Sequence, residues 1–164
     1  GRTLPNVEGS FSANVTLHGR LRVYAMIDFK YGYRKLDGNM RVRCAFFGGR
    51  CRENFYPSEF DPVRIAGIQS NNNLVDWIID DAGFAKLREV AVSYTLPDAW
   101  ARTLRASRAT VTLSGRNLHT WTGYGGLEPE AMFLGGARGG EFSAWEQTVL
   151  PQLTSWILTF NVNF

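Results

Sequence analysis

The last ten residues of the chain, 155–164, alternate between apolar and polar side chains, and only Ile157 breaks the pattern. The apolar set comprises Trp156, Leu158, Phe160, Val162 and Phe164, so the chain ends on an aromatic ring. A period of two is typical of an extended strand with one apolar and one polar face. A soluble sheet can contain such a strand, but lipid on one side and a wet lumen on the other explain it directly. The pattern therefore favours a strand of an outer-membrane β-barrel.

The same alternation recurs in four further segments, and each is about as long as the ~9–11 residues that a transmembrane strand needs. Strands are predicted over about 7–17, 21–36, 84–97, 108–120 and 152–164. Neighbouring strands joined by short turns normally pair. We therefore expect an antiparallel meander with one shared apolar face, on which lie the phases of Val7, Leu21, Val90, Val111 and Trp156. The opposite face then carries Arg22, Asp28 and Lys30.

The connections between these strands alternate between short and long. The long ones are 37–83 and 121–151, and the short ones lie near residues 18–20 and 97–107. Bacterial barrels have short periplasmic turns and long extracellular loops, and the smallest single-chain barrels have about eight strands. The expected fold class is therefore all-β: five antiparallel transmembrane β-barrel strands with long extracellular loops. They are either the C-terminal segment of a large barrel or assemble with other pieces. Phe164 is expected at the periplasmic rim.

Other classes of protein find little support in the sequence. No apolar run approaches the ~18 residues that indicate a membrane helix. The net charge of +3 comes without a basic stripe or a nucleic-acid-binding motif, so no nucleic-acid partner is expected. There is no Ser/His/Asp constellation, and the glycine-rich segment 135–140 lacks the Lys-Ser/Thr of a phosphate loop. We expect neither an enzyme nor a cofactor.

Two sequence blocks resemble a known family. Residues 76–97, from Asp76 to Pro97, match a pattern W-V-E-D-x-S-F-L-R-L-R-N-V-x-L-x-Y-T-L-P, and residues 111–130 match G-x-N-L-x-T-W-T-x-Y-x-G-x-D-P-E. Both blocks, followed by an aromatic-ended last strand, resemble the C-terminal barrel of SusC/RagA-type TonB-dependent receptors. The departures are Ala82-Gly83, where the family usually has Gly-Ser, and Glu128, where it usually has Asp.

The resemblance implies a bacterial outer-membrane receptor that imports oligosaccharides or peptides. Its implied partners are the remainder of the barrel and its plug, a SusD-like surface lipoprotein, the TonB complex, the barrel-assembly machinery, and lipid or lipopolysaccharide. The TonB-contacting segment lies in the N-terminal part of such receptors, which this chain does not match. The alternative is a barrel remnant that serves as a structural or adhesin-like surface module without transport.

Cys44 and Cys51 flank a short segment within the first long loop. Two cysteines at such spacing outside the cytoplasm usually pair, which predicts a disulfide. Free thiols and a metal site are the alternatives. Zinc is disfavoured, because two cysteines supply half of its ligands and His18 and His119 are distant in the sequence.

The remaining candidates are aromatic and acidic side chains near the long loops. The aromatic residues are Trp77, Trp121, Tyr124 and Trp145, which we interpret as an aromatic belt at the extracellular rim or as stacking surfaces for sugars. The acidic residues are Asp80, Asp81, Glu128 and Glu130, for which solvated carboxylates are the simplest reading and a Ca²⁺ site or a catalytic pair are alternatives.

Phe160 and Phe164 are expected to act as an assembly signal, because the resemblance implies an insertase that recognises an aromatic-ended last strand. The simpler alternative is that Phe164 only anchors the chain at the periplasmic interface.

Overall fold

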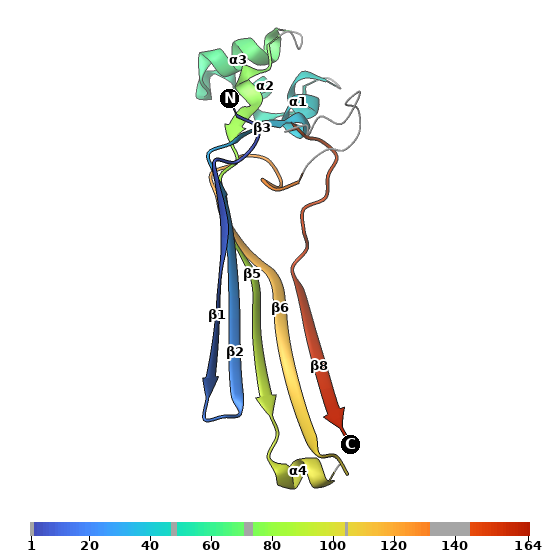
Figure 1. Ribbon diagram of the computed structural model, residues 1–164. Helices are drawn as coiled ribbons and strands as arrows, with labels where there is room; N and C mark the ends of the chain where they lie inside the picture. The colour runs from blue at the N-terminus through green and yellow to red at the C-terminus, as the bar shows by residue number, and fades with distance from the viewer. Residues whose placement is uncertain (1, 47–48, 71–73, 104, 132–144) are drawn as a thin grey trace, which may run out of the picture. The chain divides into compact units, whose positions relative to one another are not determined.

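Five long strands form one sheet in the computed structural model (Figure 1), which describes residues 2–46, 49–70, 74–103, 105–131 and 145–164. The strands are β1 (Val7–Leu17), β2 (Leu21–Tyr31), β5 (Phe84–Thr95), β6 (Arg108–Thr122) and β8 (Ser155–Asn163). Their order in the sheet is β1-β2-β5-β6-β8, so each pairs with the next long strand in the sequence. This confirms the expected antiparallel five-stranded sheet, and it is open, with β1 and β8 at its edges.

The segments that connect these strands along the sequence form a second, smaller sheet and several short helices. The sheet has the order β4-β3-β7. Its strands are β3 (Arg34–Asp37), β4 (Ile79–Asp81) and β7 (Trp145–Glu146). The helical segments are α1 (Gly38–Ala45), α2 (Arg52–Phe55), α3 (Pro62–Gln69), α4 (Asp98–Thr103) and two 3-10 turns, Pro57–Glu59 and Asp76–Ile78. Among the described residues, no helix is both long enough and apolar enough to span a membrane.

The chain divides into two compact units. The strand unit comprises Glu8–Phe29, Ala85–Trp121 and Gln152–Phe164. The helical unit comprises Gly1–Val7, Lys30–Phe84 and Thr122–Pro151. Within the strand unit, the β1–β2 turn, helix α4 and the C-terminus lie at the same end of the sheet (Figure 1).

The apolar stripes of neighbouring strands share one face of the sheet. In the antiparallel pair β6–β8, Leu113 lies opposite Leu158, and residues directly opposite each other point to the same side. Between β1 and β2, the ring of Phe29 covers Gly9 so closely that a Cβ on Gly9 would lie 2.9 Å from Phe29 Cζ. Most large side chains of this face are exposed: Phe11, Val15, Leu17, Val92, Tyr94, Leu113, Trp156, Leu158, Phe160, Val162 and Phe164.

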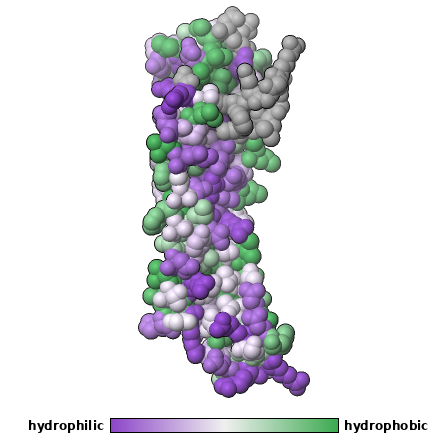
Figure 2. Space-filling model, viewed as in Figure 1, coloured by the Kyte–Doolittle hydropathy of each residue, from purple (hydrophilic) through white to green (hydrophobic). Residues whose placement is uncertain are grey.

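The polar stripes share the other face. The hydroxyl groups of Ser93 in β5 and Thr112 in β6 are 2.8 Å apart. A hollow on this face is lined by residues of four strands and of the β1–β2 turn: Thr16, Gly19, Arg20, Arg22, Ser93, Thr95, Arg108 and Thr110. Arg22 thus lies on the polar face, as the alternation predicted. Figure 2 shows hydrophilic and pale side chains across the face in view, with hydrophobic ones along its edges.

Two expectations about the connections were wrong in detail. The second strand, expected to continue to residue 36, ends at Tyr31, because Gly32 adopts a left-handed φ of +77° and residues 34–37 pair in the smaller sheet. The segment 37–83, expected as a long loop, holds three short helices and a strand around its own apolar cluster. Local capping supports these helices: the carboxylates of Asp37 and Asp61 accept backbone N–H groups at the starts of α1 and α3.

Candidate functional site

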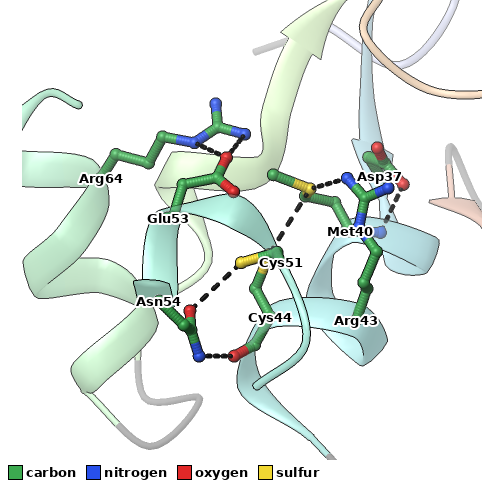
Figure 3. A network of polar contacts seen from close by, with 8 residues as sticks. All are labelled: Asp37, Met40, Arg43, Cys44, Cys51, Glu53, Asn54 and Arg64. Atoms are coloured by element: carbon green, nitrogen blue, oxygen red, sulfur yellow. Dashed lines mark hydrogen bonds and ion pairs between the residues drawn. A yellow bond between two sulfur atoms is a disulfide. The ribbon is translucent and has the colours of Figure 1, made fainter. Parts of the chain in front are cut away.

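The helical unit contains the predicted disulfide. Cys44, in the last turn of α1, is bonded to Cys51 immediately before α2, with the two Cα atoms 4.9 Å apart. Both cysteines are buried in a cluster with Met40, Ile68 and Ile78. Asn54 Nδ2 donates a hydrogen bond to the Cys44 carbonyl at 3.0 Å, and this contact ties the start of α2 to the end of α1 (Figure 3). The disulfide therefore joins the two helices within one small core.

A buried lysine holds the segment that follows β6. The Lys35 side chain, in β3, is only 2% exposed, and its ammonium donates hydrogen bonds to backbone carbonyls of Glu128 at 2.9 Å and Pro129 at 3.1 Å. It also donates to the carbonyl of Ala131. The Tyr33 hydroxyl donates to the same Pro129 oxygen at 3.0 Å. The side chains of Tyr33 and Lys35 thus fix the backbone of residues 128–131.

A buried glutamate organises the other side of this segment. Glu146, in β7, is fully buried, and its Oε1 accepts hydrogen bonds from the Leu127 backbone N–H and from Asn39 Nδ2, both at 3.0 Å. The Asn39 side chain also accepts the Thr148 N–H at 3.0 Å. The parallel pairing of β3 with β7 brings Glu146 beside Asp37. Residues more than one hundred positions apart in the sequence therefore form one polar cluster.

Burial sets the electrostatics of this polar cluster. Burial lowers the pKa of Lys35, and neighbouring carboxylates, Glu146 first among them, oppose that shift. Burial raises the pKa of the Asp37 carboxyl, against the hydrogen bond from the Met40 N–H. Burial also raises the pKa of the Tyr124 hydroxyl, so that it remains protonated. The buried charges depend on one another and on backbone groups rather than on water.

A hollow of about 300 Å³ lies beside the polar cluster. Its lining consists of Asp37, Asn39, Met40, Arg43, Gly125, Gly126 and Leu127. A carboxylate, an amide and a guanidinium around glycine backbone can donate and accept hydrogen bonds, which suits a small polar group. Among the residues that line this hollow, no nucleophile is paired with a general base.

The four predicted aromatic residues have different surroundings. Trp121 is exposed, whereas Tyr124 is 6% exposed and belongs to a core cluster with Tyr33, Ala82 and Phe84. The Lys35 ammonium lies over the Tyr124 ring, 5.5 Å from the ring centroid. Its ring therefore packs inside the unit and offers no open face for a sugar. For the other three rings the belt and the stacking roles stay predictions.

Trp77 and Trp145 both pack within the helical unit. Trp77 lies against the disulfide-containing cluster, and its indole Nε1 donates to the Leu74 carbonyl at 3.1 Å. Trp145, in β7, approaches Gly38 so closely that a Cβ there would lie 1.8 Å from the indole Nε1. Glycine is needed at the start of α1 because this ring occupies the space of a side chain.

The acidic candidates are not gathered into a metal site in the part of the chain that the structure describes. Asp81 Oδ1 accepts the Gly83 N–H at 2.8 Å, and Glu128 Oε1 accepts the Glu130 N–H at 3.3 Å. The sole cluster of three possible ligands among the described residues is Cys44, Cys51 and Glu53. Its two sulfur atoms are joined in the disulfide and supply no thiolate. The segment 135–140 lies outside the described residues.

Phe160 and Phe164 are both exposed on the apolar side of β8 or at its end. Phe160 lies opposite Val111 of β6. Their role in assembly stays a prediction.

Sequence reasoning missed the buried charged residues. Lys35 and Asp37 fit the alternation of a strand, so they were indistinguishable from side chains of a wet lumen. Glu146 follows Trp145 in a two-residue strand, which is too short to produce a periodic signal. The sequence did show charged residues next to the disulfide, since an arginine precedes each cysteine, at positions 43 and 50.

Comparison with known proteins identifies the fold. No protein-family model matches the chain, and no curated protein does. Solved structures do match. The chain resembles the structure of the RagAB peptide importer in the "closed-closed" state with a TM-score of 0.73 and 19% identity. It resembles the "open-open" state with a TM-score of 0.68 and 19% identity, and a structure of the RagAB peptide transporter with 0.69 and 18%.

These matches cover nearly all of this chain but a small part of the other. They extend over 99%, 98% and 99% of the chain and over 18%, 17% and 17% of the matched chains, in the same order. The matched proteins are named as importers or transporters and not as enzymes. The chain therefore has the fold of about one sixth of a RagAB importer chain, and it spans that share of its length.

Proposed function

We propose that this chain is the C-terminal part of the β-barrel of an outer-membrane import receptor of the SusC/RagA type. The observation that carries the proposal is the exposed apolar face shared by five antiparallel strands, opposite a face of hydroxyl and charged side chains. An exposed apolar surface of this extent needs a non-aqueous partner. Lipid on one side and a wet lumen on the other satisfy both faces of such strands.

The open edges of the sheet support a larger assembly. Unpaired backbone groups of β1 and β8 would each cost several kcal/mol in lipid, on the order of the values for polar groups without partners. Further strands of the same barrel would pair with both edges. A plug, a SusD-like lipoprotein and the TonB complex complete the proposed receptor, and the likeness to RagAB structures supports this choice.

The membrane placement is tested by single cysteines on adjacent residues of β1. The two cysteines of this segment are both in the disulfide, so a new thiol at Phe11→Cys or Ser12→Cys is the sole free thiol of the segment, and the unsubstituted protein is the labelling control. In intact outer membranes we expect a water-soluble maleimide to label the Ser12→Cys protein and not the Phe11→Cys protein. A lipophilic maleimide should show the reverse preference. Equal labelling of both positions by both reagents would refute the lipid-facing assignment.

Transport is tested separately in cells that express the full-length protein. We expect uptake of radiolabelled peptide or oligosaccharide mixtures that disappears in a strain without TonB, and co-purification of a surface lipoprotein. Surface binding of these compounds without TonB-dependent uptake would support the structural or adhesin-like alternative.

We also propose that Phe164, with Phe160, contributes to assembly of the barrel. The matched control is Phe11, an exposed aromatic residue of the same face in β1. Phe164→Ser should reduce the folded protein in the outer membrane much more than Phe11→Ser, as measured by heat-modifiable migration in SDS gels. Equal losses would mean that the terminal ring only contributes apolar surface.

A further inference from the structure

The disulfide holds two arginines side by side. Arg43 and Arg50 each immediately precede a bonded cysteine, and the Arg50 N–H donates to the Arg43 carbonyl at 2.7 Å. Their side chains therefore start from paired backbone positions. Both side chains are exposed, so an anion in solution can reach the two guanidinium groups.

A hollow of about 330 Å³ opens beside these two arginines. It is lined by Arg43, Arg50, Cys51, Arg52, Glu53 and Phe60. The half-buried ring of Phe60 gives the hollow one apolar wall, and Arg43 and Arg50 are both exposed. The guanidinium groups around the hollow outnumber its single carboxylate.

The other charges nearby are already paired. The buried carboxylate of Glu53 lies 2.9 Å from Arg64 Nη2 (Figure 3), and Arg52 Nη2 lies 2.6 Å from Glu59 Oε2. Arg43 Nη2 contacts the Met40 sulfur at 2.9 Å, and neither Arg43 nor Arg50 has an ion-pair partner within the described residues. Arg43 also lies near the Asp37 carboxyl, whose pKa its charge lowers, and the Arg50 side chain extends beside Arg43 into the hollow.

We propose that this hollow is a binding site for a phosphate group, held by the Arg43 and Arg50 guanidinium groups. Arginine presents paired N–H donors that match phosphate oxygens, and such charge-assisted bonds are among the strongest in proteins. A phosphate monoester carries roughly −1.5 to −2 charges at pH 7, which two guanidinium groups can bind together. All residues that line the site belong to the helical unit.

The proposal is tested by titrating the intact detergent-extracted protein with inorganic phosphate in a calorimeter. We expect saturable binding that Arg43→Gln/Arg50→Gln weakens by about tenfold or more, since bonds to charged groups are strong. The matched control is Arg102→Gln/Arg105→Gln, which removes two exposed arginines from the region of α4 and should leave binding unchanged. Arg43→Lys/Arg50→Lys keeps the charge without the paired donors and should bind with intermediate affinity.

Two controls separate loss of the site from loss of the fold. Arg50→Gln alone removes a side chain without hydrogen bonds to the described residues, so it should weaken binding while the disulfide still forms. Resistance of the thiols to alkylation without reductant reports that disulfide. No saturable phosphate binding, or equal weakening by the Arg43/Arg50 and the Arg102/Arg105 variants, would overturn the proposal.

The source of the phosphate is found by competition. Purified lipopolysaccharide that displaces inorganic phosphate, while its dephosphorylated form does not, would assign the site to a lipid headgroup. Phosphate binding that lipopolysaccharide leaves unchanged would assign it to a soluble phosphorylated ligand.

Discussion

The strand unit and the helical unit bury different kinds of side chain. In the strand unit, the large apolar residues of β1, β6 and β8 are mostly exposed, and Phe164 is 88% exposed. In the helical unit, the cluster around Cys44 and Cys51 is closed, and Lys35 and Glu146 are buried within hydrogen bonds. The first unit presents its apolar surface outward, and the second encloses both apolar and charged groups.

The difference shows where each unit obtains its stability. Apolar surface that stays exposed contributes nothing to the stability of the fold until lipid or further protein covers it. Buried charges, by contrast, are held by fixed internal partners, and removal of one partner leaves another charge without compensation. We therefore expect substitutions in the helical unit to change the stability of the protein with or without a membrane. The effect of substitutions in the strand unit on stability should depend on the membrane.

The largest expected effect comes from Lys35→Met in the helical unit. This change removes the donor to the carbonyls of residues 128–131 and the cation that faces Glu146. Loss of one partner from a buried charged cluster typically costs about 3–5 kcal/mol. Thermal unfolding in detergent, followed by near-UV circular dichroism, measures the loss. Arg34→Met, at the exposed neighbouring position of β3, should change the transition little. Equal shifts from both variants would show that the buried lysine contributes no special stability.

The next effect distinguishes the two faces of β8. Leu158→Arg places a charge on the exposed apolar face, and a charge at the lipid-facing midplane of a barrel costs about 2–4 kcal/mol. Thr159→Arg, one residue later, points to the polar face and should be tolerated. The folded fraction in lipid vesicles, measured by urea titration, should fall only for Leu158→Arg. A loss from Thr159→Arg as large as that from Leu158→Arg would contradict the two-faced sheet.

The five-stranded sheet was predictable because its signal is local and repeated. Alternation in β6 and β8 fixes which side chains share a face, and a one-residue shift would reverse every one of them. Short turns then make neighbours of consecutive strands. The disulfide was predictable for a similar reason, since Cys44 and Cys51 are close in sequence.

The helical unit was not predictable by the same means. Its small sheet pairs β3 with β7 across more than one hundred residues, and β7 has two residues. Its polar cluster depends on burial of Lys35 and Glu146, which no local pattern distinguishes from a wet surface. Long-range pairing of short segments decides this part of the fold, and a single sequence carries little trace of it.

Removal of the disulfide should have a smaller effect, limited to the helical unit. The bond closes a loop with a sequence separation of 7, for which the chain-entropy estimate is about 2.5 kcal/mol. Cys44→Ser/Cys51→Ser should therefore speed proteolysis within residues 38–69. The heat-modifiable migration that reports the folded sheet should stay the same. Parallel losses of protease resistance and of the folded sheet would show that the two units unfold together.

The smallest effect concerns Asp37, the N-cap of α1. Its carboxylate accepts the Met40 N–H at 2.8 Å, and burial raises its pKa above the ordinary value of 3.8. A carboxyl group with a raised pKa in the folded state contributes stability at pH below that ordinary value and loses it as the pH rises through the folded-state pKa. Asn also serves as an N-cap but carries no charge. The stability of Asp37→Asn relative to the native protein should therefore increase as the pH rises from below 3.8, and should then level off.

Asp37→Ala separates the cap from the charge. Alanine removes both, and loss of an N-cap typically costs about 1 kcal/mol at every pH. Unfolding curves of the three proteins at several pH values should show the Asn and Ala variants offset by a constant amount. The native protein alone should change relative to both, because it alone carries the Asp37 carboxyl. A pH-independent difference between the native protein and Asp37→Asn would mean that the Asp37 carboxylate is compensated as fully in the folded helical unit as in water. The contrast between enclosed charges and outward apolar surface would then rest on Lys35 and Glu146 alone.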